Sequence, residues 1–203
     1  KRLLSIRKMS VKKYPKAGIN LKNFRDHNKF YLKLKGEIFH LIESLIEDGY
    51  ELNMFCFGRN PGPDDYKIAK IMGIDLSKIK VHNPYNDFRS FMESLLNSDV
   101  NFGFAYHFTV LSLIMSIPVF SYYLGEYYKQ KILGILKVYS LEDLCHNAKN
   151  ITYGLKFMRD LLSRGKEKIK RVMELKTEKI YRKTMESYLA SYRELFEKIS
   201  QKF

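Results

Sequence analysis

Cysteine is scarce in this sequence, with only Cys56 and Cys145 among 203 residues. Cys56 lies inside the apolar run MFCF and Cys145 inside DLCHN, and neither context has the spacing of a metal site or of a disulfide framework. A lone cysteine in an apolar run is typical of a buried thiol. We therefore expect no metal and no resident cofactor, and we interpret Cys56 as part of the core.

The chain also lacks a hydrophobic run long enough to span a membrane. Its longest apolar stretch, residues 108–124, is slightly short for a span and is interrupted by Pro118 and three serines. No signal-peptide pattern is found, and the chain begins with Lys1 in place of methionine. We therefore predict a cytoplasmic protein, and we expect that part of the protein is missing upstream of Lys1.

Acidic residues are few at the two ends of the chain, which has a net charge of +14. Residues 1–40 hold twelve basic and two acidic side chains, residues 155–203 hold fourteen and seven, and the middle is nearly neutral. The positive electrostatic field of such ends attracts phosphate, anionic polysaccharide, acidic lipid or nucleic acid, and it does not indicate which of these is the partner. No zinc-finger, homeodomain or RNP pattern is present, so we predict no nucleic-acid partner. The basic amphipathic stretch LLSRGKEKIKRVMELK makes an anionic membrane surface a candidate partner.

The first half of the chain combines a helical pattern with short apolar strands. Apolar residues recur every three or four positions over residues 24–46, which predicts a helix that ends at Gly49. The run ELNMFCFG predicts a buried strand, and RNPGPDD a turn after it. Residues 66–72 suggest a short helix and KIKVH a minor strand, while residues 3–6 are a short apolar strand followed by a basic, turn-prone segment.

The second half repeats this alternation at the spacing of βαβ units. We predict helices over residues 86–97, 106–115 and 127–136, and strands over residues 100–104, 118–122 and 137–139. This predicts an α/β fold with a Rossmann-like parallel sheet and helices on both faces, formed by residues 1–150. Residues 151–203 predict long, basic, amphipathic helices that pack back on the sheet or on a partner domain.

One histidine, His107, lies where a predicted strand passes into a predicted helix. In open parallel sheets, ligands bind beyond the carboxyl ends of the strands, where helix amides favour an anion. A neutral imidazole there could donate a hydrogen bond or transfer a proton, and Gly103 would let the backbone approach a ligand. The alternative is a helix-start histidine that bonds a neighbouring carbonyl. The sequence leaves both interpretations open.

The same stretch resembles the polysaccharide pyruvyl transferase family. The family pattern has glycine, arginine and histidine at alternate positions, followed by a small-apolar helix and a strand with proline. The corresponding residues here are GFAYH, from Gly103 to His107, followed by FTVLSLIMSIPVF. LLSIR, GYELNMFCFG, DDYKIAKIMG and DFRSFMESLLNSDVNFGF resemble the preceding family elements in order. The resemblance covers residues 3–143. It departs from the family at Ala105, where the family has arginine, and Lys129 follows the last core strand only after an apparent insertion.

This resemblance implies the second, donor-binding domain of a GT-B-like enzyme of surface polysaccharide synthesis, with an amino-terminal partner domain missing upstream of Lys1. Phosphoenolpyruvate would be the donor, and a glycan or lipid-linked sugar the acceptor of a pyruvate ketal. It implies His107 as acid/base or hydrogen-bond donor and Arg7 as a clamp for carboxylate or phosphate. The other implied substrate-binding residues are Arg59, Gly103, Ala105, Tyr106 and Tyr122. The aspartate of the resemblance, Asp65, is sufficiently explained as a helix cap.

Two other functions remain compatible with the same sequence. A GT-B-like domain could use a sugar nucleotide as donor in place of phosphoenolpyruvate. A non-catalytic module could use its basic ends to bind an anionic membrane, which would also suit an enzyme peripheral to the membrane. The loss of the family arginine at Ala105 leaves open whether catalysis is retained.

Overall fold

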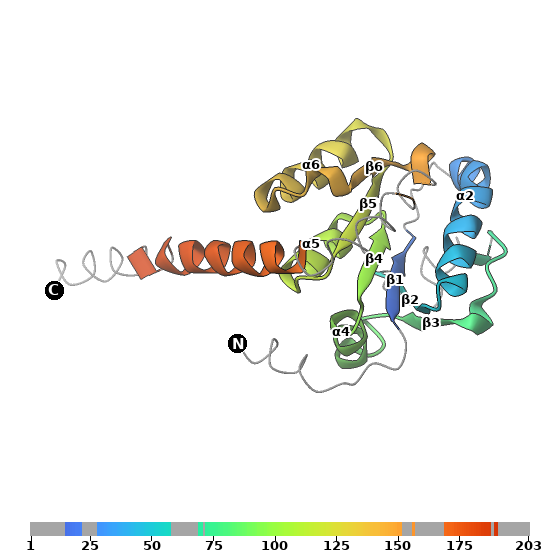
Figure 1. The fold of residues 1–203 in the computed structure, drawn as a ribbon, viewed down its shortest axis with the longest axis horizontal. Helices are drawn as coiled ribbons and strands as arrows, with labels where there is room; N and C mark the ends of the chain where they lie inside the picture. Colours follow the sequence, from blue (N-terminus) through green and yellow to red (C-terminus); the bar gives the residue numbers. More distant parts are fainter. Residues whose placement is uncertain are drawn as a thin grey trace.

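The computed structural model describes residues 15–21, 28–57, 69–70, 72–151, 156, 169–187 and 189–190. Its centre is a six-stranded sheet in the order β3-β2-β1-β4-β5-β6, and every neighbouring pair is parallel (Figure 1). The strands are β1 Lys16–Asn20, β2 Glu51–Phe55, β3 Ile79–His82, β4 Val100–Gly103, β5 Val119–Tyr123 and β6 Cys145–Asn147.

Helices cover both faces of this sheet (Figure 1). They are α2 Asn28–Glu47, α4 Phe88–Leu96, α5 Tyr106–Ile114 and α6 Gly125–Tyr139, with short 3-10 turns at Leu76–Lys78, Glu142–Leu144 and Ala148–Asn150. α2 lies on one side, and α5 and α6 lie on the other. The predicted α/β, Rossmann-like fold is confirmed. Within the described residues, no helix has the length and apolar character needed to cross a membrane.

The central strand β1 falls where the sequence predicted a basic turn, and that prediction is wrong for Lys16–Asn20. Glycine weakens a strand on its own, but here close packing requires it. A Cβ atom at Gly18 would overlap the side chains of Asn101 and Phe55. Tertiary packing therefore overrides the local turn signal. The predicted strand at residues 3–6 lies outside the described residues.

The last predicted strand, residues 137–139, is also wrong. These residues form the final turn of α6, because Ile132, Leu136 and Tyr139 are buried at helical spacing. Ser140 then ends the helix with a left-handed φ of 57°. The strand that completes the sheet is β6, which pairs with β5 through Ser121 and Cys145.

The two faces of the sheet differ in chemistry. The face toward α2 is apolar, and Ile19, Met54 and Phe102 share one buried cluster with α2 residues. The face toward α5 carries buried polar groups that bond to that helix. Asn101 Nδ2 donates to Ser112 Oγ at 2.8 Å, and the hydroxyl oxygens of Ser121 and Thr109 are 2.7 Å apart. Buried hydrogen bonds of this kind fix the register of a helix on a sheet more specifically than apolar contact does.

The helix of residues 169–187 packs on the body only in its first half. Met173 is fully buried, and the Thr177 hydroxyl lies 3.3 Å from both the Leu113 carbonyl oxygen and the Tyr139 hydroxyl. Residues 181–187 are all exposed, and this part projects away from the sheet (Figure 1). The projecting part exposes apolar side chains such as Tyr181 and Met185.

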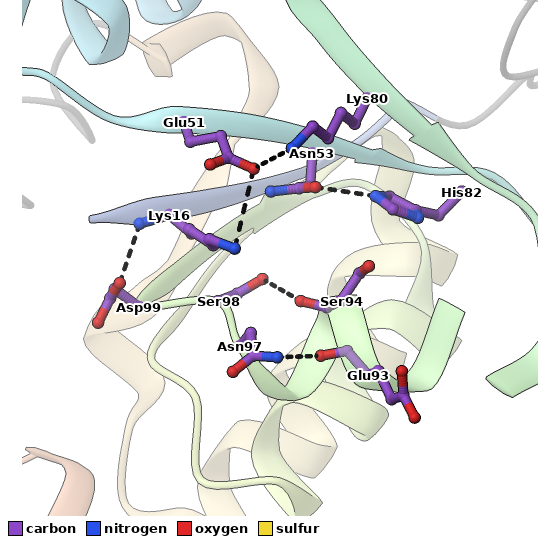
Figure 2. A network of polar contacts seen from close by, with 10 residues as sticks. All are labelled: Lys16, Glu51, Asn53, Lys80, His82, Glu93, Ser94, Asn97, Ser98 and Asp99. Atoms are coloured by element: carbon purple, nitrogen blue, oxygen red, sulfur yellow. Dashed lines mark hydrogen bonds and ion pairs between the residues drawn. The ribbon is translucent and has the colours of Figure 1, made fainter. Parts of the chain in front are cut away.

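A polar network spans β1, β2 and β3 on the face toward α4 (Figure 2). Glu51 lies between Lys80 and Lys16, with oxygen–nitrogen distances of 2.8 and 3.8 Å. Farther along, His82 Nε2 is 2.8 Å from Asn53 Oδ1, and the imidazole stacks on the ring of Phe55. Burial lowers the pKa of His82, and the charges of Lys80 and Lys16 lower it further.

Protonation of His82 is therefore expected to destabilise the fold. A histidine whose pKa is lower in the folded state than its unfolded value of about 6.5 stabilises the protein above that value, and the contribution is lost as the pH falls through the folded pKa. The pKa of His146 is also lowered, mainly by burial. The free energy of unfolding should fall as the pH is lowered from about 7.5 to 5.5.

Urea unfolding across this pH range tests the expectation. His82→Gln combined with His146→Gln should flatten the pH profile, whereas His40→Gln, at an exposed position on α2, should leave it unchanged. An identical slope in the wild type and the double variant would contradict the assignment.

Candidate site at the β1–β4 edge

The topological switch point of the sheet lies between β1 and β4. β1 pairs with β2 on one side and with β4 on the other, so the direction of strand order reverses there. Open α/β sheets bind ligands at the carboxyl ends of such strands. The candidate site is therefore the sheet edge formed by the end of β1, the end of β4 and the start of α5.

Asn20, the last residue of β1, holds this edge together. Its Nδ2 donates to the Phe55 carbonyl oxygen of β2 at 2.7 Å, and its Oδ1 accepts from the Ala105 backbone N–H at 3.0 Å. The Asn20 side chain is fully buried. It therefore links β1, β2 and Ala105, the residue that immediately precedes α5. Asn20 was not among the residues predicted from the sequence, although a polar residue at the end of a short apolar stretch was an available signal.

Gly103 is required by packing at the end of β4. A Cβ atom there would overlap the ring of Phe108 and lie 3.2 Å from the Asn20 Cβ atom. Its role in the structure is thus to let α5 pack closely against the strand ends. This packing explains the glycine without a ligand.

His107 is exposed in the first turn of α5. Its ring lies against that of Tyr106, with the ring centres 5.7 Å apart. No side chain caps α5 at Ala105, whereas the Asp87 carboxylate caps α4 by accepting from the Ser90 N–H. The backbone amides of the first turn of α5 and the positive end of the helix dipole therefore lie at the same helix start as the accessible imidazole of His107.

A lysine that the sequence analysis did not select lies beside this helix start. Lys131 Nζ is 5.7 Å from the Tyr106 ring centre and 4.7 Å from that of Tyr127. The interaction with Tyr127 raises the pKa of Lys131. Lys129, the lysine noted in the sequence after the last core strand, instead pairs with Glu126 at 3.3 Å. A tyrosine and a lysine four positions apart in the predicted helix were the available signal.

Tyr122 does not line this edge, so the structure corrects its assignment as a substrate contact. It is fully buried on the face opposite α5, against the ring of Phe104. Burial raises its pKa, and its hydroxyl has no hydrogen-bond partner among the described residues. Ala105 is also buried and acts through its backbone N–H.

The remaining predicted site residues, Arg7, Arg59 and Asp65, lie outside the described residues. In the described part of the chain, no three histidine, cysteine, aspartate or glutamate side chains form a group able to hold a metal.

Comparison with known proteins identifies the fold of the chain but not a family. No protein-family profile and no curated protein sequence matches the chain. The O-GlcNAc transferase of Thermobaculum terrenum, solved as a single-residue mutant, matches with a TM-score of 0.57 and 14% identity, over 90% of this chain and 35% of that one. A UDP-N-acetylglucosamine 2-epimerase structure from Listeria monocytogenes matches with a TM-score of 0.52 and 15% identity, over 85% of this chain and 41% of that one.

The chain has the fold of one GT-B half. It spans about two fifths or less of the length of each of these two structures. In this GT-B-like half, the β1–β4 edge with Asn20, Gly103 and His107 is the position where open α/β sheets bind ligands.

Proposed function

We propose that this GT-B-like chain is the donor-binding half of a transferase of surface polysaccharide synthesis that moves a pyruvyl group from phosphoenolpyruvate to a sugar as a ketal. The observation that carries the proposal is His107, exposed in the first turn of α5 next to the switch point. The ordered resemblance over residues 3–143 supplies the donor. The fold agrees with the GT-B architecture that this family resemblance implies.

The chemistry needs an acid, a base and positive charge. Protonation of the methylene carbon of phosphoenolpyruvate makes its C2 electrophilic, and a sugar hydroxyl adds to C2 as it gives its proton to a base. A second hydroxyl then displaces phosphate from C2, which completes the ketal and releases inorganic phosphate. His107 would transfer these protons, and the α5 amides would bind the phosphate.

The family arginine is replaced by Ala105, so another group must supply its charge. Lys131 provides a positive charge beside Tyr106. Tyr106 belongs to the first turn of α5. An ammonium group can stabilise a phosphate as a point charge where a bidentate arginine is missing. Lys131 could therefore bind a substrate phosphate at this edge.

The test is to incubate the chain, with any amino-terminal domain encoded with it, with phosphoenolpyruvate and candidate glycans. Phosphate release should depend on the glycan, and mass spectrometry should show a ketal on the sugar. Glycan-independent or absent release would contradict pyruvyl transfer.

A second candidate is transfer from a sugar nucleotide. It is favoured by the two similar structures, which are named for O-GlcNAc transfer and for UDP-N-acetylglucosamine epimerisation. UDP-N-acetylglucosamine in place of phosphoenolpyruvate, with nucleotide release as the readout, separates the two donors. If neither donor is consumed and the chain binds anionic vesicles in a salt-sensitive way, the non-catalytic membrane module becomes the better proposal.

A further inference from the structure

Three side chains from two helices form an accessible cluster near the carboxyl edge of the sheet. Tyr106 belongs to α5, and Tyr127 and Lys131 belong to α6. The Tyr127 ring is 63% exposed, and Lys131 is exposed as well. Lys131 Nζ lies within cation–π range of both rings, at 4.7 Å from Tyr127 and 5.7 Å from Tyr106.

The electrostatic surroundings of Lys131 differ from those of its neighbour Lys129. Lys129 pairs with the Glu126 carboxylate one turn earlier. The groups that influence Lys131 are the side chains of Tyr127, Tyr106 and Tyr128. The largest influence is a hydrogen bond with the Tyr127 side chain, which uses one N–H donor of the ammonium group and leaves the other donors available. Lys131 is thus a positioned cation with hydrogen-bond donors to offer an anion.

Exposed aromatic faces beside such a cation suit a particular ligand chemistry. Small-molecule sites combine apolar and aromatic surface with a few placed polar groups. A tyrosine ring offers a flat apolar face with a polar tip, against which the apolar face of a sugar or nucleoside ring can pack. The ammonium group can bind a phosphate carried by that ring compound.

We propose that Tyr106, Tyr127 and Lys131 form a subsite for a sugar ring that bears a phosphate. The proposal rests on the proposed function in placing a sugar substrate at this edge, and it extends that function by assigning the residues that bind the sugar. The ligand is either a phosphate-linked acceptor sugar or the sugar moiety of a sugar nucleotide. Both present a ring to Tyr127 and a phosphate to Lys131.

The chain offers matched controls for a binding test. N-acetylglucosamine 1-phosphate is titrated by calorimetry against the wild type, Tyr127→Ala and Lys131→Met. The controls are Tyr181→Ala, which removes a 64% exposed tyrosine on the projecting helix, and Lys129→Met, which removes the lysine paired with Glu126. Each site variant should weaken binding by about tenfold or more, and each control should stay within about twofold.

Further probes distinguish the two possible sources of the ligand and define the results that would contradict the subsite. Tighter binding of UDP-N-acetylglucosamine than of the sugar phosphate would indicate the nucleotide donor, and equal binding would indicate the acceptor. Inorganic phosphate that binds as well as the sugar phosphate would overturn the subsite, because the rings would then contribute nothing. A lower melting temperature in Lys131→Met with unchanged affinity would also overturn it, since the cluster would then only join α5 to α6.

This test is separate from that of the proposed function. Sugar phosphate binding that depends on Tyr127 and Lys131 would stand even if phosphoenolpyruvate released no phosphate. Conversely, phosphate release with no effect of Tyr127→Ala on sugar affinity would retain pyruvyl transfer and remove the subsite.

Discussion

Replacing His107 with alanine is expected to reduce glycan-dependent phosphate release from phosphoenolpyruvate by about 100-fold or more. General acid–base catalysis by one positioned side chain contributes on the order of 10²–10⁴ in rate. His107 is exposed in the first turn of α5, so removing its ring should leave the fold intact. The measurement is the steady-state rate of phosphate release, with melting temperature as a check on folding.

A matched histidine and a conservative variant sharpen this prediction. His40→Ala removes an exposed imidazole from α2, on the opposite face of the sheet, and should retain full activity. His107→Gln keeps a hydrogen-bond donor but cannot transfer a proton near neutral pH. If this variant is as inactive as His107→Ala, the role is acid–base; substantial recovery assigns a hydrogen bond to the substrate. Full activity of His107→Ala would remove His107 from the mechanism.

Asn20→Ala is expected to lower the free energy of unfolding by about 2–4 kcal/mol, because it removes two buried hydrogen bonds and leaves a cavity. The Phe55 carbonyl oxygen and the Ala105 N–H would both lose the side-chain partner that they have in the structure. Since the second bond fixes Ala105, the residue that immediately precedes α5, the start of that helix should also loosen. Urea unfolding measures the first effect, and hydrogen exchange of the Ala105 amide measures the second.

Asn101→Ala is the matched control on the neighbouring strand. Asn101 is also a fully buried asparagine, but the structure gives its side chain one hydrogen bond, from Nδ2 to Ser112 Oγ in the last turns of α5. The cost should be about 1 kcal/mol, since a comparable volume is lost with fewer unmet partners. Ala105 should exchange as in the wild type. Equal destabilisation, or unchanged Ala105 exchange in Asn20→Ala, would contradict the role of Asn20 in positioning α5.

The helices and most strands of the described chain follow from local pattern. The stripe ending at Gly49 became α2, and Gly49 has the left-handed φ of 79° expected of a helix-terminating glycine. The alternation after residue 86 became α4, β4, α5 and β5 close to the expected bounds. Apolar periodicity identifies such elements because each must bury one face.

Two predictions, the turn at β1 and the strand at residues 137–139, are wrong because the contacts that decide these elements are not local in the sequence. β1 contains Gly18, and a glycine suggests a turn when only the sequence is considered. In the structure, the side chains of Asn101 and Phe55 pack so closely on Gly18 that a Cβ atom would overlap them. Residues 137–139 have strand composition, but burial of Tyr139 on the same face as Ile132 keeps them helical. In both cases the deciding contacts are made with residues that are far away in the sequence.

The sequence by itself determined the α/β alternation, the basic ends and the placement of His107 at a strand-to-helix junction, because these depend on residue type and short-range spacing. Only the tertiary structure decided that Asn20 anchors the start of α5, that Tyr122 is buried and that Lys131 in place of Lys129 lies beside Tyr106. The reason is physical: hydrogen bonds and cation–π contacts between separate elements depend on strand order and on how one helix lies against the next, and neither is encoded in any short stretch of the chain.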